Sequence, residues 1–111
     1  MALDLAAARH QLALLARRKR ARVLGWPRDW RPHEVIDPRD KQPLTDAGAW
    51  EMVADLLEVG CSLEEVELES PPGKLAYVIQ TTLNDRQLYV KLELGSGTVI
   101  ARSFHYSVYR N

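Results

Sequence analysis

The chain has 111 residues, of which 46% are hydrophobic, and its 15 basic side chains are balanced by 15 acidic ones. This length fits one domain with one core, and the hydrophobic fraction excludes a disordered chain. No apolar run approaches the ~20 residues that span a bilayer. The single cysteine, Cys61, excludes an internal disulfide and a metal cage built from thiolates.

The order of residues at the amino terminus is not that of a secretory signal, because the charged cluster follows the apolar stretch instead of preceding it. We therefore expect a soluble protein of the reducing cytoplasm that does not associate with membranes.

The charges are unevenly placed along the chain. Residues 1–45 hold ten basic and five acidic side chains, residues 46–70 hold eight acidic and no basic ones, and residues 71–111 hold five basic and two acidic ones. Two basic regions around an acidic one permit a polyanionic partner at zero net charge, although many ordinary domains are as uneven.

We predict a single domain that begins with a basic helix over residues 1–24, since apolar residues recur at helical spacing from Leu5 to Leu15. Basic side chains crowd its last turns, where cations suit the negative end of the helix dipole. The alternative is a patch that binds phosphate or a partner, with three candidate phosphate contacts: Arg17, Arg18 and Arg20.

Residues 25–44 contain four prolines and two tryptophans, Trp26 and Trp30, and are predicted to form an ordered connector. The tryptophans can stack on bases, but anchoring to the core is the more common role. A second helix is predicted after Thr45, its N-cap, and ends before Gly60. Its apolar stripe comprises Trp50, Val53, Ala54 and Leu57.

Strand-like segments follow at 66–69, 74–83, 88–94 and 98–108, separated by turns at Pro71-Pro72-Gly73, Asn84-Asp85 and Gly95-Ser96-Gly97. Residues 45–111 are thus expected to hold one helix and a meander of antiparallel strands. The fold class is α+β, with N-terminal helices packed on one face of a small curved antiparallel sheet.

The last two strands carry the candidate chemistry. A three-residue loop at 95–97 would pair Leu92 with Ile100 and place Ile100 and Phe104 on the apolar face. Four side chains would then share the opposite face: Tyr89, Lys91, Ser103 and His105. In this register Arg102 points to the apolar side unless a bulge turns it.

A face of this kind suits RNA phosphodiester cleavage, which needs a base, an acid and cations around the charged transition state. His105 can take either proton role near neutral pH, while Lys91 and Arg102 can supply charge and Tyr89 a hydrogen bond or a stacking surface. We expect no metal and no cofactor, because the three histidines are scattered.

The stretch Leu88-Tyr89-Val90-Lys91-Leu92, with a short turn and then Val99-Ile100-Ala101-Arg102-Ser103-Phe104-His105, resembles the C-terminal strands of MqsR-type toxins. These belong to the RelE-like superfamily of bacterial toxin–antitoxin systems. The likeness covers roughly residues 45–107, including Thr45-Asp46-Ala47-Gly48-Ala49-Trp50 and Pro71-Pro72-Gly73-Lys74.

This resemblance implies a RelE-like fold and a metal-independent endoribonuclease that cleaves mRNA and is neutralised by a cognate antitoxin protein. It implies catalytic roles for Tyr89 and for His105, where the family commonly has Lys, and it places Lys91 in the shared strand. It also suggests that Gln80 corresponds to a catalytic Gln. Lys74, after the Pro-Pro-Gly turn, is a further candidate phosphate contact.

Two other functions remain open at the level of sequence. One is a non-catalytic regulatory module that binds nucleic acid or protein on the same scaffold, and the other is a purely structural partner subunit. A homodimer and a hetero-oligomer with an antitoxin are both compatible with the sequence.

Overall fold

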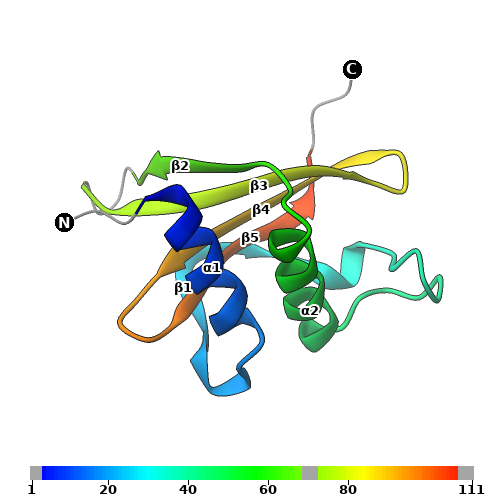
Figure 1. Ribbon diagram of the computed structural model, residues 1–111. Coiled ribbons are helices and arrows are strands. Elements are labelled where there is room, and N and C mark those ends of the chain that lie inside the picture. Colours follow the sequence, from blue (N-terminus) through cyan, green and yellow to red (C-terminus); the bar gives the residue numbers. More distant parts are fainter. Residues whose placement is uncertain (1–3, 69–72, 108–111) are drawn as a thin grey trace.

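The computed structural model describes residues 4–68 and 73–107, apart from the side chains of residues 26–28. Within them lie two α-helices and one five-stranded sheet, an α+β arrangement (Figure 1). The expected positions of Glu69, Pro71, Pro72 and Val108 at a strand end, a turn and the last strand lie outside the described residues.

Helix α1 spans Leu5–Ala16 and begins at Asp4, whose Oδ1 accepts a hydrogen bond of 2.7 Å from the Ala7 N–H. It is shorter than the predicted helix over residues 1–24. The chain leaves the helix at Arg17, makes a short 3₁₀ turn, η1, over Lys19–Ala21, and then becomes extended. The basic cluster therefore does not form the last turns of a helix.

Helix α2 spans Asp46–Glu58 and confirms its predicted ends. The Thr45 side chain accepts a hydrogen bond of 2.9 Å from the Gly48 N–H, and Gly60 has a φ of 85° just beyond the C-cap Val59. The predicted apolar stripe is buried: Trp50, Val53, Ala54 and Leu57.

The sheet has the strand order β1-β5-β4-β3-β2. Its strands are β1 (Arg22–Trp30), β2 (Leu63–Glu67), β3 (Leu75–Leu83), β4 (Arg86–Leu94) and β5 (Val99–Tyr106). Strand β1 runs parallel to β5, and the other neighbours are antiparallel. The sheet is therefore mixed and not wholly antiparallel as predicted.

Strand β1 also corrects the predicted connector over residues 25–44, whose first part is an edge strand. Only its second part, after Trp30, is irregular, with a 3₁₀ turn, η2, over Pro32–Glu34. On sequence alone the prolines favour a connector over a strand. A proline is nevertheless tolerated in an edge strand, where one backbone N–H can be missing.

The β4–β5 pairing differs from the predicted register by one residue near the loop. Leu94 faces Val99 across a four-residue connection, so Ile100 pairs with Glu93 on the face opposite to Leu92. A bulge then inserts Arg102 between the pairs Leu92–Ala101 and Lys91–Ser103. This extra residue restores the predicted shared face for Tyr89, Lys91, Ser103 and His105.

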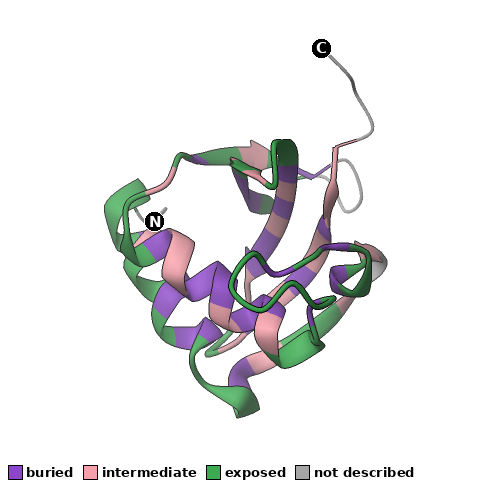
Figure 2. Ribbon diagram, turned by 90° about the vertical axis from the view of Figure 1, so that its right-hand side faces the viewer, coloured by how far each residue is buried: buried purple, intermediate pink, exposed green. Residues whose placement is uncertain are grey.

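Both helices lie on the same face of the sheet (Figures 1 and 2), and along β4 buried residues alternate with partly exposed ones from Leu88 to Leu92. Val90, Leu92 and Phe104 are fully buried there against residues such as Leu12 and Val53. No described helix covers the other face of the sheet, which carries the predicted polar residues. The two-layer plan thus leaves one sheet face available for a site.

Candidate functional site

A row of polar side chains crosses three neighbouring strands on the face away from the helices. Gln80 on β3 pairs with Tyr89 on β4, and Tyr89 pairs with His105 on β5. The rings of Tyr89 and His105 are stacked, with centroids 5.5 Å apart and an interplanar angle of 24°. The register, including the bulge, is what places these two rings in contact.

His105 is held at both ring nitrogens. Its Nδ1 lies 2.8 Å from the backbone oxygen of Tyr106, and its Nε2 lies 3.3 Å from Oδ2 of Asp29 on β1. A backbone carbonyl only accepts, so Nδ1 carries a hydrogen in this contact. Because Asp29 also accepts, only the protonated ring can donate to both neighbours. The side chain is 21% exposed, so solvent or a substrate can reach it.

Asp29 was not predicted as a site residue. Its Oδ1 lies 2.5 Å from Nε of Arg31, so the carboxylate bridges a guanidinium and an imidazole. Asp29 lies in the second half of β1 and Arg31 directly follows this strand. The sequence predicted both residues to belong to the connector. The apolar, strand-like start of β1, Val23 and Leu24, is the local pattern that could have indicated a strand.

Tyr89 is partly buried in the row. Burial, reinforced by the nearby Glu64 carboxylate, raises the pKa of its phenol above the ordinary value. The hydroxyl therefore stays protonated at neutral pH and keeps a hydrogen that it can donate to a ligand.

Lys91 and Arg102 both lie on the sheet face that carries the polar row, but they differ in whether the charge can contact a substrate. Lys91 pairs with Ser103, next to the Tyr89–His105 pair, and is partly exposed. Arg102 is turned to this face by the bulge, where its guanidinium forms an ion pair with Glu93. The side chain of Arg102 is only 12% exposed, and that of Glu93 is only 4% exposed. Arg102 is thus bound to a buried carboxylate instead of projecting toward a phosphate.

Gln80, the suggested counterpart of a catalytic Gln, pairs with Tyr89, and its Oε1 accepts a hydrogen bond of 2.8 Å from Nε2 of Gln87. Lys74 is exposed just before the start of β3. Six residues of extended chain separate it from Gln80, a distance of about 20 Å. Lys74 therefore lies outside the cluster around His105.

No protein-family model, curated protein or solved structure matches the chain.

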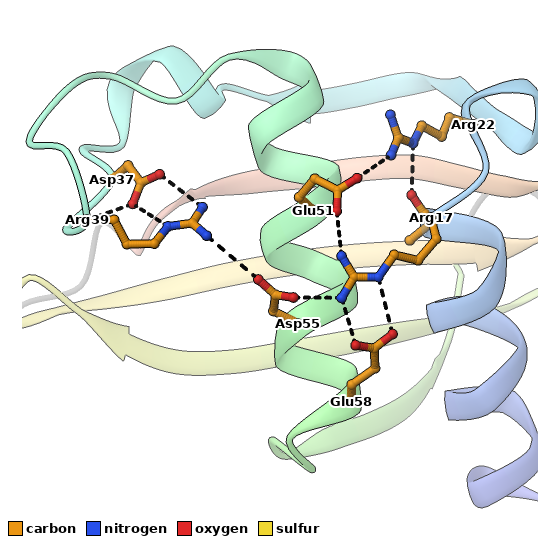
Figure 3. Close-up of polar contacts among 8 residues, drawn as sticks. Arg17, Arg22, Asp37, Arg39, Glu51, Asp55 and Glu58 are labelled. Carbon is orange, nitrogen blue, oxygen red and sulfur yellow. Dashed lines mark hydrogen bonds and ion pairs between the residues drawn. The ribbon is translucent and has the colours of Figure 1, made fainter.

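The basic residues after α1 lie at the other end of the sheet from His105. They precede Arg22, which pairs with Val99 at the start of β5, whereas His105 is near the end of that strand. Arg18 and Arg20 are exposed. Arg17 instead contacts three carboxylates of α2, as Figure 3 shows: Glu51, Asp55 and Glu58. Its predicted role as a phosphate contact competes with this ion-pair network.

Trp30 anchors β1 to the core, the more common of its two predicted roles. The centroid of its ring lies 4.9 Å from that of Trp50 and 5.3 Å from that of Phe104. Its Nε1 donates a hydrogen bond of 2.7 Å to Oδ1 of Asp46. The side chain of Trp26 lies outside the described residues. Burial raises the pKa of the Cys61 thiol, which makes it a poor nucleophile at neutral pH.

Residues 4–68 and 73–107 hold no group of three or more His, Cys, Asp or Glu side chains placed to bind a metal ion. None of their helices is long and apolar enough to cross a membrane.

Proposed function

We propose that the chain is a toxin-like, metal-independent endoribonuclease of RelE-like fold, related to the MqsR-type toxins. It cleaves mRNA in the cytoplasm and is neutralised by an antitoxin protein. The observation that carries the proposal is the position of His105. Its imidazole is stacked on Tyr89, is 3.3 Å from Asp29 and lies beside Lys91 on a sheet face that no described helix covers.

In the proposed reaction the ribose 2′-oxygen attacks the adjacent phosphorus, and the bond from phosphorus to the 5′-oxygen breaks. Asp29 accepts the 2′-hydroxyl proton as the base, and protonated His105 gives its Nε2 proton to the leaving 5′-oxygen. The products are a 2′,3′-cyclic phosphate and a 5′-hydroxyl. Exchange with solvent returns both groups to their starting states.

The remaining residues of the row bind the substrate in this proposal. Lys91 offsets the negative charge that builds up on the phosphate, since cations close to such charge lower the barrier. The Tyr89 phenol donates a hydrogen bond to a phosphate oxygen and supports the imidazole by stacking. Gln80, at the end of the row, contacts the neighbouring nucleotide.

The proposal is tested by expression in bacteria and by digestion of RNA in the presence of a chelator. Induced wild-type protein is expected to arrest growth and to cleave RNA, and His105→Ala is expected to do neither. His33→Ala is the matched control, because His33 is exposed and contacts only Glu34 among the described carboxylates. Equal cleavage by wild type and His105→Ala contradicts the proposal.

A second candidate function is a non-catalytic module that binds nucleic acid. The exposed Arg18 and Arg20 favour it, because neither forms an ion pair with a carboxylate in residues 4–68 or 73–107 and both can contact phosphates away from His105. This function predicts that RNA stays intact but binds with an affinity that falls as the salt concentration rises. The digestion experiment separates the two candidates.

A further inference from the structure

Strand β1 forms one edge of the sheet. It pairs only with β5 in the order β1-β5-β4-β3-β2, so its outer backbone groups bond to no other strand of the described sheet. Such an edge is a template to which an extended segment of another chain can add as a further strand. The first part of this edge is Arg22–Gly25, and its pairing with β5 is regular from Arg22 to Leu24, before the register shift between Leu24 and Asp29.

The regular part of the β1 edge exposes apolar side chains. Val23 and Leu24 are each 41% exposed. Successive strand residues point to opposite faces, so the edge offers an apolar contact on each side of an added strand. An exposed edge of this composition is usually protected by charges or covered by a partner.

The other edge of the sheet is protected. Strand β2 is short, and three of its five residues are glutamates: Glu64, Glu65 and Glu67. Their carboxylates repel an acidic strand and make the edge unfavourable for pairing. The β1 edge has no comparable acidic protection over Arg22–Gly25.

A hollow of about 440 Å³ adjoins the start of β1. Its lining includes Val23 and Leu24 of the edge together with Ala47 and Trp50 of α2. Arg22 also lines it and is held in place by Glu51, at 3.2 Å, and by the Ala16 backbone oxygen, at 2.8 Å (Figure 3). Arg22 and the buried Trp50 are thus held in place at the hollow, which has room for an apolar side chain.

Cations surround this end of β1. Arg18, Lys19 and Arg20 are exposed, and none of them forms an ion pair with a carboxylate in residues 4–68 or 73–107. Asp46, the acidic residue that lines the hollow, accepts the hydrogen bond from Trp30. The charge around the edge therefore favours an acidic segment.

We propose that the Arg22–Gly25 edge of β1 binds an extended acidic segment of a partner protein as an added strand. One apolar side chain of the segment enters the hollow beside Trp50, and its carboxylates contact Lys19 and Arg20. This interaction does not depend on RNA cleavage. It lies at the opposite end of β1 from Asp29, so the two can be tested separately.

The probe is a fluorescein-labelled peptide in which glutamate alternates with valine and leucine, and binding is measured by fluorescence anisotropy. Lys19→Glu is expected to weaken binding ~5- to 10-fold, as reversing a charge contact does. Leu24→Ser is expected to weaken it as well. Lys74→Glu makes the same charge change next to the start of β3, three strands away from β1, and is expected to leave binding unchanged.

Amide hydrogen exchange separates strand addition from general charge attraction. Peptide binding is expected to protect backbone amides within residues 22–25 in the wild type. Absent binding, equal binding by Lys19→Glu and Lys74→Glu, or protection only elsewhere overturns the proposal. A dimer that forms through β1 in sedimentation experiments, without the peptide, also overturns it because the occupant is then a second copy. RNA digestion by Lys19→Glu at the wild-type rate keeps this test distinct from that of the proposed nuclease.

Discussion

His105 Nε2 lies 3.3 Å from Oδ2 of Asp29, across the parallel pair of β5 and β1. This contact joins a predicted site residue to one that local sequence patterns did not indicate. Asp29 also forms an ion pair with Arg31. The side chains that contact one another around His105 therefore extend from the C-terminal strands to the end of β1.

Asp29→Asn tests the role of this contact in RNA cleavage. The amide keeps the size of the side chain but cannot accept a proton, so cleavage is expected to fall about 10²-fold or more. Glu34→Gln is the control, because Glu34 also contacts Arg31, at 3.9 Å, but has no contact with His105 among those described. Equal loss in both variants would show that Asp29 acts only through Arg31.

Tyr89 is predicted to act through both its ring, which stacks on His105, and its hydroxyl. Two substitutions distinguish these contributions. Tyr89→Phe keeps the ring against His105 and is expected to retain stability while losing RNA affinity. Tyr89→Ala removes the ring and is expected to cost a further ~0.5–1.5 kcal/mol of aromatic contact, beyond the burial lost. Urea unfolding and RNA binding, measured on both variants, check this. Unchanged RNA affinity in Tyr89→Phe would exclude a role for the hydroxyl.

The sequence predicted those parts of the fold that depend on neighbouring residues. The ends of α2 follow from Thr45 and Gly60, and the β3–β4 turn follows from Asn84 and Asp85, which both adopt positive φ. The shared face of Tyr89 and His105 was also predicted. It holds in the structure because the bulge at Arg102 compensates the longer loop.

The parts that the sequence did not predict depend on contacts between distant segments. Strand β1 pairs in parallel with β5, and no local pattern specifies a partner so far along the chain. Asp29 was missed for the same reason. The helix over residues 1–24 was predicted too long because Arg17 was assigned to the helix dipole, whereas it binds three carboxylates of α2.

The Arg17 network is predicted to make stability depend on acid pH. The hydrogen bond from Arg17 holds the pKa of the Glu58 carboxyl below its ordinary value. The contribution of this interaction to the free energy of unfolding is therefore complete above the pKa that Glu58 has in the unfolded chain. It is lost as the pH falls through the lower pKa of Glu58 in the folded protein. The difference in Tm between wild type and Arg17→Ala is expected to shrink between about pH 7 and pH 3.

Arg18→Ala is the control for this experiment, since Arg18 forms no ion pair with a described carboxylate. Its Tm is expected to follow that of the wild type at every pH. A Tm difference for Arg17→Ala that does not change with pH would contradict the account.

Gly25 is predicted to be required where β1 approaches β5. A Cβ at this position would lie 2.7 Å from Cγ2 of Ile100 and 3.3 Å from the Ala101 backbone oxygen. Gly25→Ala is therefore expected to destabilise the protein by ~1–3 kcal/mol. Adding Ile100→Ala removes Cγ2, so the double variant is expected to lose less than the sum of the two single losses. Additive losses in urea unfolding would exclude this contact.

The most direct test of the proposed acid–base site is the chemistry of the RNA ends after digestion with a chelator present. Wild type is expected to leave 2′,3′-cyclic phosphates and 5′-hydroxyls, His33→Ala the same products at the same rate, and His105→Ala intact RNA. Products with 5′-phosphates, or cleavage that survives His105→Ala, would contradict the account.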